Sequence, residues 1–422
     1  MENIVKTYPS GLRLIVCPMP GFKSIATSVL VGVGSRDELE GEHGISHFVE
    51  HMLFKGTKTR TSNEIANTLS GLGVDYNAWT STNATCYHTK GLDSNVDTCC
   101  DILSDMYFNL QFKEEDFKRE CEVIVQEIAM RDDHPRMSLG ELCAETFFKG
   151  TQYGHNIAGT VEGIRKITSN DIYSYIKKHY VAPKTIISFA GDITVEQAEE
   201  LMDKYFTKRF LTEQKPLSRD LNSIFMKPER QFVTRVKDIE QQNVAILFPA
   251  MNNNSDEKYA MSFVQAILAG DMSSRLFDSV RDRLGLVYTI SGGLYLTSVG
   301  GYFHIFFSCT PKNTELVLKT IAEEIEKIRA KGVTDAEVQK IKNIKRSNTL
   351  FKSEDVEETN TRNATLLNEF NVIQTVEDYL ENIESVSKED VDAMVKKYLN
   401  FDSAIVGLVG KKTNIKPFVF LN

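Results

Sequence analysis

The sequence predicts an α+β fold of two homologous domains, each a mixed β-sheet covered by helices. First, a chain of 422 residues is longer than one ordinary hydrophobic core accommodates. Second, the hydrophobic periodicity breaks over residues 212–229, a stretch that contains two prolines. Third, a pattern of residues recurs in the two halves. We therefore expect a first domain over 1–212, a linker over 213–229 and a second domain over 230–422.

The recurring pattern is visible when the second half of the chain is aligned with the first at an offset of 219 positions. Identical or similar residues then coincide in eight pairs: Ile164 with Ile383, Asp171 with Asp390, Ile172 with Val391, Ile176 with Val395, Lys177 with Lys396, Lys178 with Lys397, Ile186 with Ile405, and Gly191 with Gly410. A helix, a turn and a strand therefore recur in register, whereas elsewhere the halves share only the order of their elements. We interpret the repeat as two homologous domains.

Alternating apolar residues and helical periodicity place the elements of the first half. The expected strands are 12–18, 24–33 and 185–190, with a long strand or a hairpin over the Thr- and Tyr-rich segment 74–91. The expected helices are 44–54, 61–70, 95–110, 114–132, 137–148, 170–180 and 194–205. Two of these helices begin with capping boxes, Thr61-x-x-Glu64 and Thr194-x-x-Gln197, whose side chains satisfy free N–H groups of the first turn.

The second half repeats this alternation of strands and helices. The expected strands are 232–236, 243–248, 288–296 and 301–309. The expected helices are 257–268, 274–284 and 314–330, the last of which ends at Gly332. A third capping box, Thr334-x-x-Glu337, begins one more helix.

Residues 44–54, GISHFVEHMLF, divide into two faces when they are read as a helix. One face is apolar, and the other holds His47, Glu50 and His51. The histidines are four residues apart, so their Cβ atoms lie about 5–6 Å apart, within reach of one metal ion. His-x-x-Glu-His is the inverted form of a zinc-protease helix motif. The alternative is a solvated helix face, and a catalytic zinc also needs a third protein ligand.

The helix expected at 114–132 offers that third ligand. Glu120 and Glu127 are seven residues apart, which is two helical turns, and they share a face. A carboxylate in such an apolar stretch is costly to bury unless a cation or hydrogen bonds compensate. Taken alone, this helix is better read as half exposed, with both glutamates in water. Taken with His47 and His51, it predicts a metal site.

The HFVEH motif at 47–51, followed 76 positions after His51 by Glu127, resembles the M16 (pitrilysin-type) family of zinc peptidases. The resemblance covers nearly the whole chain. It is to the branch of short chains that includes bacterial processing peptidases and the β subunit of the mitochondrial processing peptidase. It implies that His47, His51 and Glu127 bind one Zn²⁺ per chain and that Glu50 is the general base.

The resemblance extends to residues around this centre. Glu120 matches a carboxylate that supports the metal ligands in the family. Asn77, Ala78, Trp79 and Thr80 resemble the edge strand on which the family pairs an extended peptide substrate. The alternative for this segment is a core strand that contains a turn.

In the second half, Arg281 and Tyr288 resemble an arginine and a tyrosine that reach the substrate backbone beside the scissile bond in this family. A guanidinium and a phenol are suitable donors to a carbonyl or an oxyanion. Without the resemblance, a surface arginine and a packing tyrosine are the simpler interpretation. In family members of this length two chains close like a clamshell, and zinc of one chain faces the Arg and Tyr of the other. The resemblance therefore implies a homodimer with composite sites.

Composition and charge restrict the function classes. The net charge of −9 without a basic block argues against nucleic-acid binding. Seven cysteines without Cys-x-x-Cys spacing indicate reduced thiols in an intracellular compartment. We find no pattern of a signal or transit peptide and no apolar run near the roughly 18 residues of a membrane span. We expect no membrane association and a bacterial-type cytoplasm, with an organelle matrix as the alternative.

The sequence thus predicts a zinc-dependent endopeptidase that cleaves unfolded peptides or presequence-like segments inside a closed chamber. Glu50 would take the proton of the attacking water. The alternatives are a non-proteolytic structural or assembly subunit and a member of a heterodimer. Zinc content and an assay of the purified single chain distinguish these alternatives.

Overall fold

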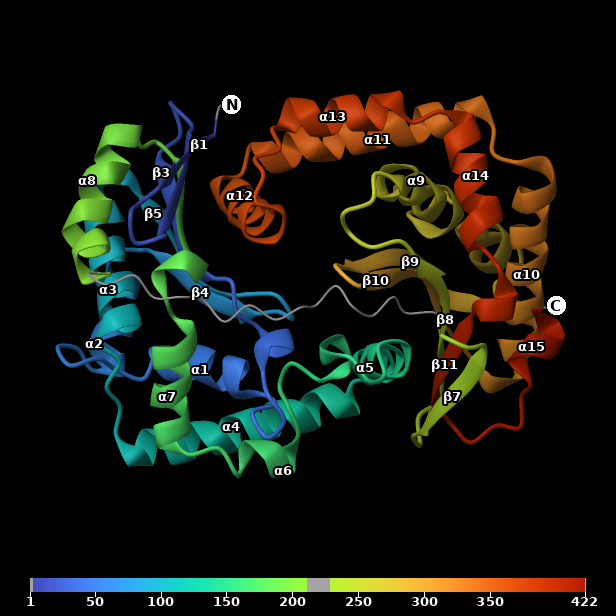
Figure 1. Cartoon of the computed structure of the whole chain (residues 1–422). Helices are drawn as coiled ribbons and strands as arrows, with labels where there is room; N and C mark the ends of the chain where they lie inside the picture. Colours follow the sequence, from blue (N-terminus) through green and yellow to red (C-terminus); the bar gives the residue numbers. More distant parts are fainter. Residues whose placement is uncertain (1–2, 211–227, 422) are drawn as a thin grey trace. The chain divides into compact units, whose positions relative to one another are not determined.

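A computed structural model of the protein describes residues 3–210 and 228–421. They form two compact units, neither of which is one continuous stretch of sequence (Figure 1). The first unit comprises 3–129, 155–210 and 349–378, and the second comprises 130–154, 228–348 and 379–421. The chain passes from one unit to the other inside two long helices, α4 (Glu114–Asp133) and α11 (Asp335–Ser353). The predicted linker lies outside the described residues except for its last two positions, and the predicted domain limits remain a prediction.

The first unit contains a mixed six-stranded sheet. Its strands are, in spatial order, β1 (Ile4–Thr7), β2 (Arg13–Pro18), β6 (Thr185–Gly191), β3 (Ser24–Val31), β5 (Thr85–Leu92) and β4 (Asp75–Thr80). The pair β2–β6 is parallel and the other pairs are antiparallel. The segment 74–91 is therefore a hairpin, β4–β5, and the short strand β1 is an element that the sequence did not predict.

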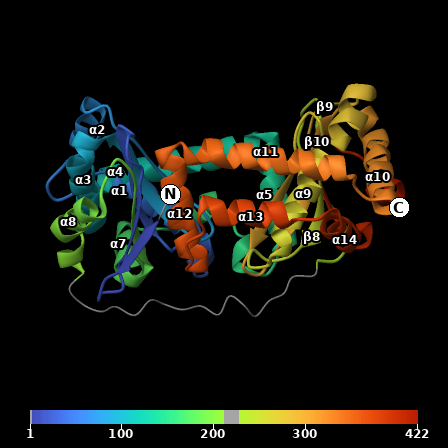
Figure 2. The same ribbon diagram turned by 90° about the horizontal axis from the view of Figure 1, so that it is seen from above.

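Helices cover both faces of this sheet. One face packs on α1 (Ile45–Leu53), α2 (Ser62–Gly71), α3 (Val96–Phe108), α4, α6 (Val161–Ile164), α7 (Ser169–His179) and α8 (Val195–Tyr205). The other face packs on α12 (Val356–Phe370), which comes from the second half of the sequence (Figure 2). Ser28 of β3 donates a hydrogen bond to Asn360 of α12 (2.6 Å), and the Asn360 amide donates to the Ala26 carbonyl (3.0 Å). These buried bonds hold α12 on the sheet.

The second unit repeats this topology. Its five strands are, in spatial order, β7 (Gln231–Val236), β11 (Ile405–Gly410), β8 (Gln242–Ala250), β10 (Gly300–Cys309) and β9 (Val287–Thr297), and only β7–β11 is parallel. One face packs on α9 (Glu257–Ala269), α10 (Thr314–Lys331), α11, α14 (Lys388–Tyr398) and α15 (Pro417–Phe420). The other packs on α5 (Pro135–Phe147), which the first half of the sequence supplies. The predicted fold of two mixed sheets covered by helices is confirmed.

One more helix and several three-residue turns connect these elements. They are α13 (Val376–Ser385), η1 (Ser35–Asp37), η2 (Asp93–Asn95), η3 (Gln152–Gly154), η5 (Thr207–Arg209) and η7 (Pro311–Asn313).

The structure confirms the repeat at an offset of 219. Helices α7 and α14 correspond residue for residue, and each begins with a capping box, at Thr168 and Ser387 respectively. The single turns η4 (Ala182–Lys184) and η8 (Phe401–Ser403) follow at the same offset, and β6 and β11 end on equivalent glycines.

One expected helix differs from the prediction. Within 274–284 the chain forms a π-helix, η6 (Phe277–Arg283). The apolar residues Leu276 and Val280 both reach the core, a spacing that α- and π-helices share, so periodicity alone does not separate the two. Short π-helical segments are frequent at functional sites.

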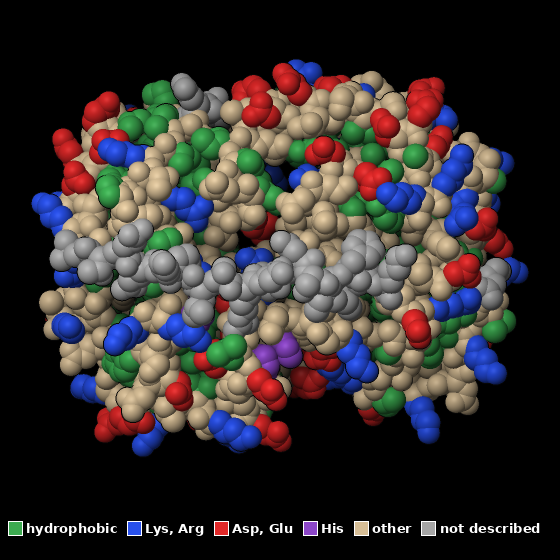
Figure 3. Space-filling model, viewed as in Figure 1, with side chains coloured by type: hydrophobic (Ala, Val, Ile, Leu, Met, Phe, Trp, Pro, Cys, Tyr) green, Lys and Arg blue, Asp and Glu red, His purple; other side chains and the backbone are tan. Residues whose placement is uncertain are grey.

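The surface carries both signs of charge. Figure 3 shows acidic and basic side chains interspersed on the face in view. Among the helices of 3–210 and 228–421, none is long and apolar enough to cross a membrane.

Candidate metal centre

Helix α1 places the predicted motif at the surface of the first unit's core. Its apolar face, which includes Phe48, Val49 and Met52, is fully buried, as the helical pattern predicts. The opposite face presents His47, which is mostly buried, and His51, which is partly exposed. The two imidazole centroids lie 4.6 Å apart. Local helical geometry therefore brings the two histidines together without any distant contact.

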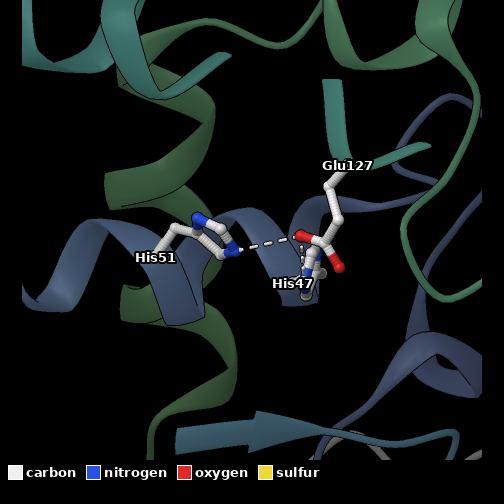
Figure 4. Close-up of side chains that lie close together, drawn as sticks. All are labelled: His47, His51 and Glu127. Atoms are coloured by element: carbon white, nitrogen blue, oxygen red, sulfur yellow. Dashed lines mark ion pairs between the residues drawn. The ribbon is translucent and has the colours of Figure 1, made fainter. Parts of the chain in front are cut away.

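Glu127 of α4 meets both histidines. Its Oε2 lies 3.6 Å from the Nε2 of His47 and 3.6 Å from the Nε2 of His51, as the dashed lines of Figure 4 mark. One potential ligand atom from each residue lies within 4.8 Å of the others. Around a tetrahedral zinc with ligand bonds of about 2.0–2.1 Å, neighbouring donor atoms are roughly 3.3 Å apart. The spacing and the donor set, two imidazoles and a carboxylate, therefore fit a zinc ion that keeps a position open.

Glu120 orients one of these histidines. Its Oε1 accepts a hydrogen bond from Nδ1 of His51 at 2.9 Å, and its Oε2 lies 2.7 Å from Nζ of Lys55. Burial raises the pKa of the Glu120 carboxyl, but the hydrogen bonds from His51 and Lys55 outweigh burial, so the pKa is lowered overall. An ionised Glu120 favours the tautomer of His51 that carries its proton on Nδ1, which leaves the Nε2 lone pair for a metal.

Glu50 lies beside this cluster on α1. Thr80 of β4 donates a hydrogen bond from Oγ1 to Oε2 of Glu50. Burial raises the pKa of the Glu50 carboxyl above its ordinary value, Thr80 and His51 lower it in part, and Glu127 raises it further. The raised pKa means that this carboxylate takes up a proton more readily than an exposed glutamate does.

The predicted substrate strand is the edge of the sheet. Asn77, Ala78, Trp79 and Thr80 lie in β4, which among the described residues pairs only with β5. The outer edge of β4 therefore presents backbone N–H and C=O groups that can pair with another strand. The end of β4 is tied to Glu50 by the Thr80 hydrogen bond, so this end of the strand lies beside the candidate metal centre.

Arg281 and Tyr288 come together in the second unit. The Arg281 guanidinium lies 4.4 Å from the ring centroid of Phe277 and 5.7 Å from that of Tyr288. Tyr288 is 80% exposed near the start of β9, the edge strand of its sheet, so it is not a packing residue. Arg281 belongs to the π-helix η6. Tyr288 is therefore exposed beside the half-buried Arg281, and both side chains carry groups that can donate hydrogen bonds.

The sequence did not predict two residues that support the candidate metal centre by contacting α1 or Glu120. Lys55, four residues after His51, pairs with Glu120, and Glu38 accepts hydrogen bonds from the first turn of α1. Burial raises the pKa of the Glu38 carboxyl, while its hydrogen bonds to His43 and to the backbone of Ser46 and Gly44 oppose that shift. The only sequence signal was a group of acidic residues before the motif, which did not distinguish Glu38 from its neighbours.

Comparison with known proteins finds similarity to one peptidase family along most of the chain. The family model described as Insulinase (Peptidase family M16) matches residues 19–161, and the model described as Peptidase M16 inactive domain matches residues 166–345. An uncharacterized zinc protease of Rickettsia felis is 31% identical over 414 residues, which cover 96% of this chain and 98% of the relative. One of Mycobacterium leprae is 29% identical over 412 residues, which cover 96% and 92% respectively.

Solved structures share the fold. A protease from Helicobacter pylori superposes with a TM-score of 0.91 at 23% identity, covering 97% of this chain and 99% of that one. A structure described as a peptidase M16 inactive domain from Pseudomonas fluorescens gives a TM-score of 0.88 at 17% identity, covering 99% and 100%. With both halves matched by family models and a relative of 31% identity aligned end to end, the chain belongs to peptidase family M16.

Proposed function

We propose that this protein is a zinc-dependent endopeptidase that cleaves unfolded peptides or presequence-like segments. The observation that carries the proposal is the convergence of His47 Nε2, His51 Nε2 and Glu127 Oε2 at 3.6 Å. The relatives of 28–31% identity that are named zinc proteases support it.

The chain's own residues divide the chemistry among them. Zinc, when bound by His47, His51 and Glu127, would supply Lewis-acid activation of water and of the scissile carbonyl. Glu50 takes the proton of the attacking water on its carboxylate and passes it to the nitrogen of the leaving amine. Thr80 holds Oε2 of Glu50, which leaves Oε1 for the proton.

The free edge of β4 binds the substrate. A peptide in extended conformation adds to this edge through backbone hydrogen bonds, which require no particular side chain. Thr80 lies at the end of β4 and contacts Glu50, so a bond of the added peptide is brought beside the general base. Because only an unfolded segment can add as a strand, this mode of binding selects unfolded peptides.

We further propose that the active form is a homodimer whose two copies close around the substrate. The metal cluster lies in the first unit, whereas Arg281 and Tyr288 lie in the second. In the dimer that the family resemblance implies, Arg281 and Tyr288 of one copy donate to the scissile carbonyl at the metal of the other. Each copy then contributes to two composite sites.

The test is cleavage of a quenched-fluorescent, unstructured, basic peptide by the purified, zinc-loaded protein beside its Glu50→Gln variant. Cleavage by the unaltered protein alone is expected. If neither protein cleaves any of several peptides although both contain zinc, the chain is a structural subunit or needs a second, different chain. Light scattering on the same samples reports whether the chain forms dimers.

A further inference from the structure

Helix α1 begins without a side-chain cap of its own. Its N-cap residue is Gly44, whose φ of 96° lies in the left-handed region that glycine adopts at low cost. A Cβ at this position would lie 2.6 Å from Cδ1 of Ile164 and 2.7 Å from the carbonyl oxygen of Ala158. The Ser, Thr, Asp or Asn that usually accepts hydrogen bonds at a helix start therefore cannot stand here.

Glu38 supplies the missing acceptors from outside the helix. Its Oε2 accepts a hydrogen bond from the backbone N–H of Gly44 and its Oε1 one from that of Ser46, each at 2.9 Å. The side chain is completely buried. A carboxylate at this end of a helix is also stabilised by the helix dipole.

Three further contacts surround the cap. Nδ1 of His43 lies 3.8 Å from Oε2 of Glu38, and the ring of His43 stacks on that of His155 at 3.8 Å between centroids. The hydroxyl groups of Ser46 and Tyr175 are hydrogen-bonded to each other at 2.9 Å. The first turn of α1 thus contacts side chains from two other segments of the first unit, Glu38 and Tyr175.

The capped residues are adjacent to a metal ligand. Ser46 directly precedes His47, so the hydrogen bond to Glu38 sets the backbone from which the His47 ring projects. His51 lies one turn further on and is held separately by Glu120. Glu38 thus contacts the turn that carries His47, whereas Glu120 contacts the His51 ring itself.

We propose that Glu38 is a positioning residue of the metal centre, because its cap holds the first turn of α1 where His47 can bind zinc together with His51 and Glu127. This inference rests on the proposed zinc-peptidase function. It goes beyond helix stability, since a cap that only stabilised α1 would leave the affinity for zinc unchanged in the folded protein. Removing the cap should instead free the first turn and misplace His47 before it unfolds the unit.

Two substitutions and a matched control separate these cases. Glu38→Gln keeps the shape and one acceptor oxygen, and Glu38→Ala removes both acceptors. Thr194→Ala removes the side-chain cap of α8 in the same unit, where Thr194 accepts from the N–H of Gln197. For each metal-free protein, zinc affinity is measured by chelator competition, the visible spectrum is recorded with Co²⁺ bound, and thermal unfolding is followed.

We expect about a tenfold loss of zinc affinity for Glu38→Gln and a larger loss for Glu38→Ala, the range typical of residues behind metal ligands. The Co²⁺ spectrum should change with them, because the coordination geometry depends on His47. Thr194→Ala should lower the unfolding temperature and bind zinc as the unaltered protein does. If Glu38→Ala does not fold, Glu38→Gln decides the question.

If the unaltered protein binds zinc, two results would overturn the inference. One is a Glu38→Gln variant with unaltered zinc affinity and an unaltered Co²⁺ spectrum. The other is a Thr194→Ala variant that loses as much affinity as Glu38→Gln, since loss of any cap would then have the same effect. If the unaltered protein itself fails to bind zinc, the proposed function fails and the inference fails with it. Zinc binding by the unaltered protein with no effect of Glu38→Gln overturns the inference alone.

Discussion

Glu120 and His51 come from different helices and share a hydrogen bond of 2.9 Å between Oε1 and Nδ1. The bond turns the other nitrogen of the imidazole, Nε2, toward Glu127. The same carboxylate accepts from Lys55, so it stays charged in a mostly buried position. The ring orientation and the tautomer of His51 therefore depend on Glu120, a residue that would not itself bind the metal.

Replacement of Glu120 should weaken metal binding. In Glu120→Gln the negative charge opposite Lys55 is lost, and the tautomer of His51 is no longer fixed by an ionic acceptor. We expect zinc affinity to fall about 10- to 100-fold by chelator competition. The control is Glu122→Gln on the same helix, where Glu122 is exposed and pairs with Arg165. Equal zinc affinity in the two variants would contradict the role of Glu120.

Variants of Glu50 and Glu127 should have different effects, because Glu50 is proposed to act in catalysis alone and Glu127 to bind the metal. Glu50→Gln removes the general base but none of the three ligands, so turnover should fall by a factor of about 10² to 10⁴ while zinc content, measured by elemental analysis, stays at one per chain. Glu127→Gln should lose zinc as well as activity. Full turnover in Glu50→Gln would exclude Glu50 as the base.

The homodimer predicts complementation between two inactive variants. Glu50→Gln lacks the base and Arg281→Ala lacks the donor, but a mixed dimer joins the intact metal unit of one chain to the intact Arg281 of the other. In an equimolar mixture with free exchange, half of the dimers are mixed and each holds one complete site. Peptidase activity should recover to about a quarter of the unaltered level per chain. No recovery, with mixed dimers demonstrated by a tag, would rule out composite sites.

The second unit should lose stability in acid through Glu337. Burial raises the pKa of its carboxyl, but hydrogen bonds from Arg275 and Thr334 outweigh burial and lower the pKa from 4.5 to about 2. A group whose pKa is lower in the folded state stabilises it above the unfolded pKa, so this stability is lost as the pH falls from about 5 to about 2. Urea unfolding at pH 6 and pH 3 should show a smaller loss for Glu337→Gln than for the unaltered protein.

A control accompanies that measurement. Glu389 is exposed, so Glu389→Gln should follow the unaltered protein at both pH values. If Glu337→Gln loses as much stability between pH 6 and pH 3 as the unaltered protein does, the Arg275–Glu337 pair is not a source of the acid sensitivity.

The sequence by itself determined the features that depend on local geometry. His47, Glu50 and His51 share a face because residues three and four apart do so on any α-helix. Glu127 was predicted as the third ligand of the metal site because a carboxylate in an apolar helix needs a cation or hydrogen bonds. The repeat between α7 and α14 was readable because it keeps a constant offset. Short-range periodicity carries this information without knowledge of the fold.

Only the tertiary structure decided which distant residues complete these local features. Glu38 contacts the start of α1, Lys55 contacts Glu120 and Thr80 contacts Glu50, each through one or two atoms, and no periodic pattern marks such contacts. Helix α5 was expected from the sequence and α12 was not, and each covers the sheet that the other half of the sequence mainly builds. The hydrophobic effect is non-directional, so burial of a stripe does not specify its partner until the whole chain is folded.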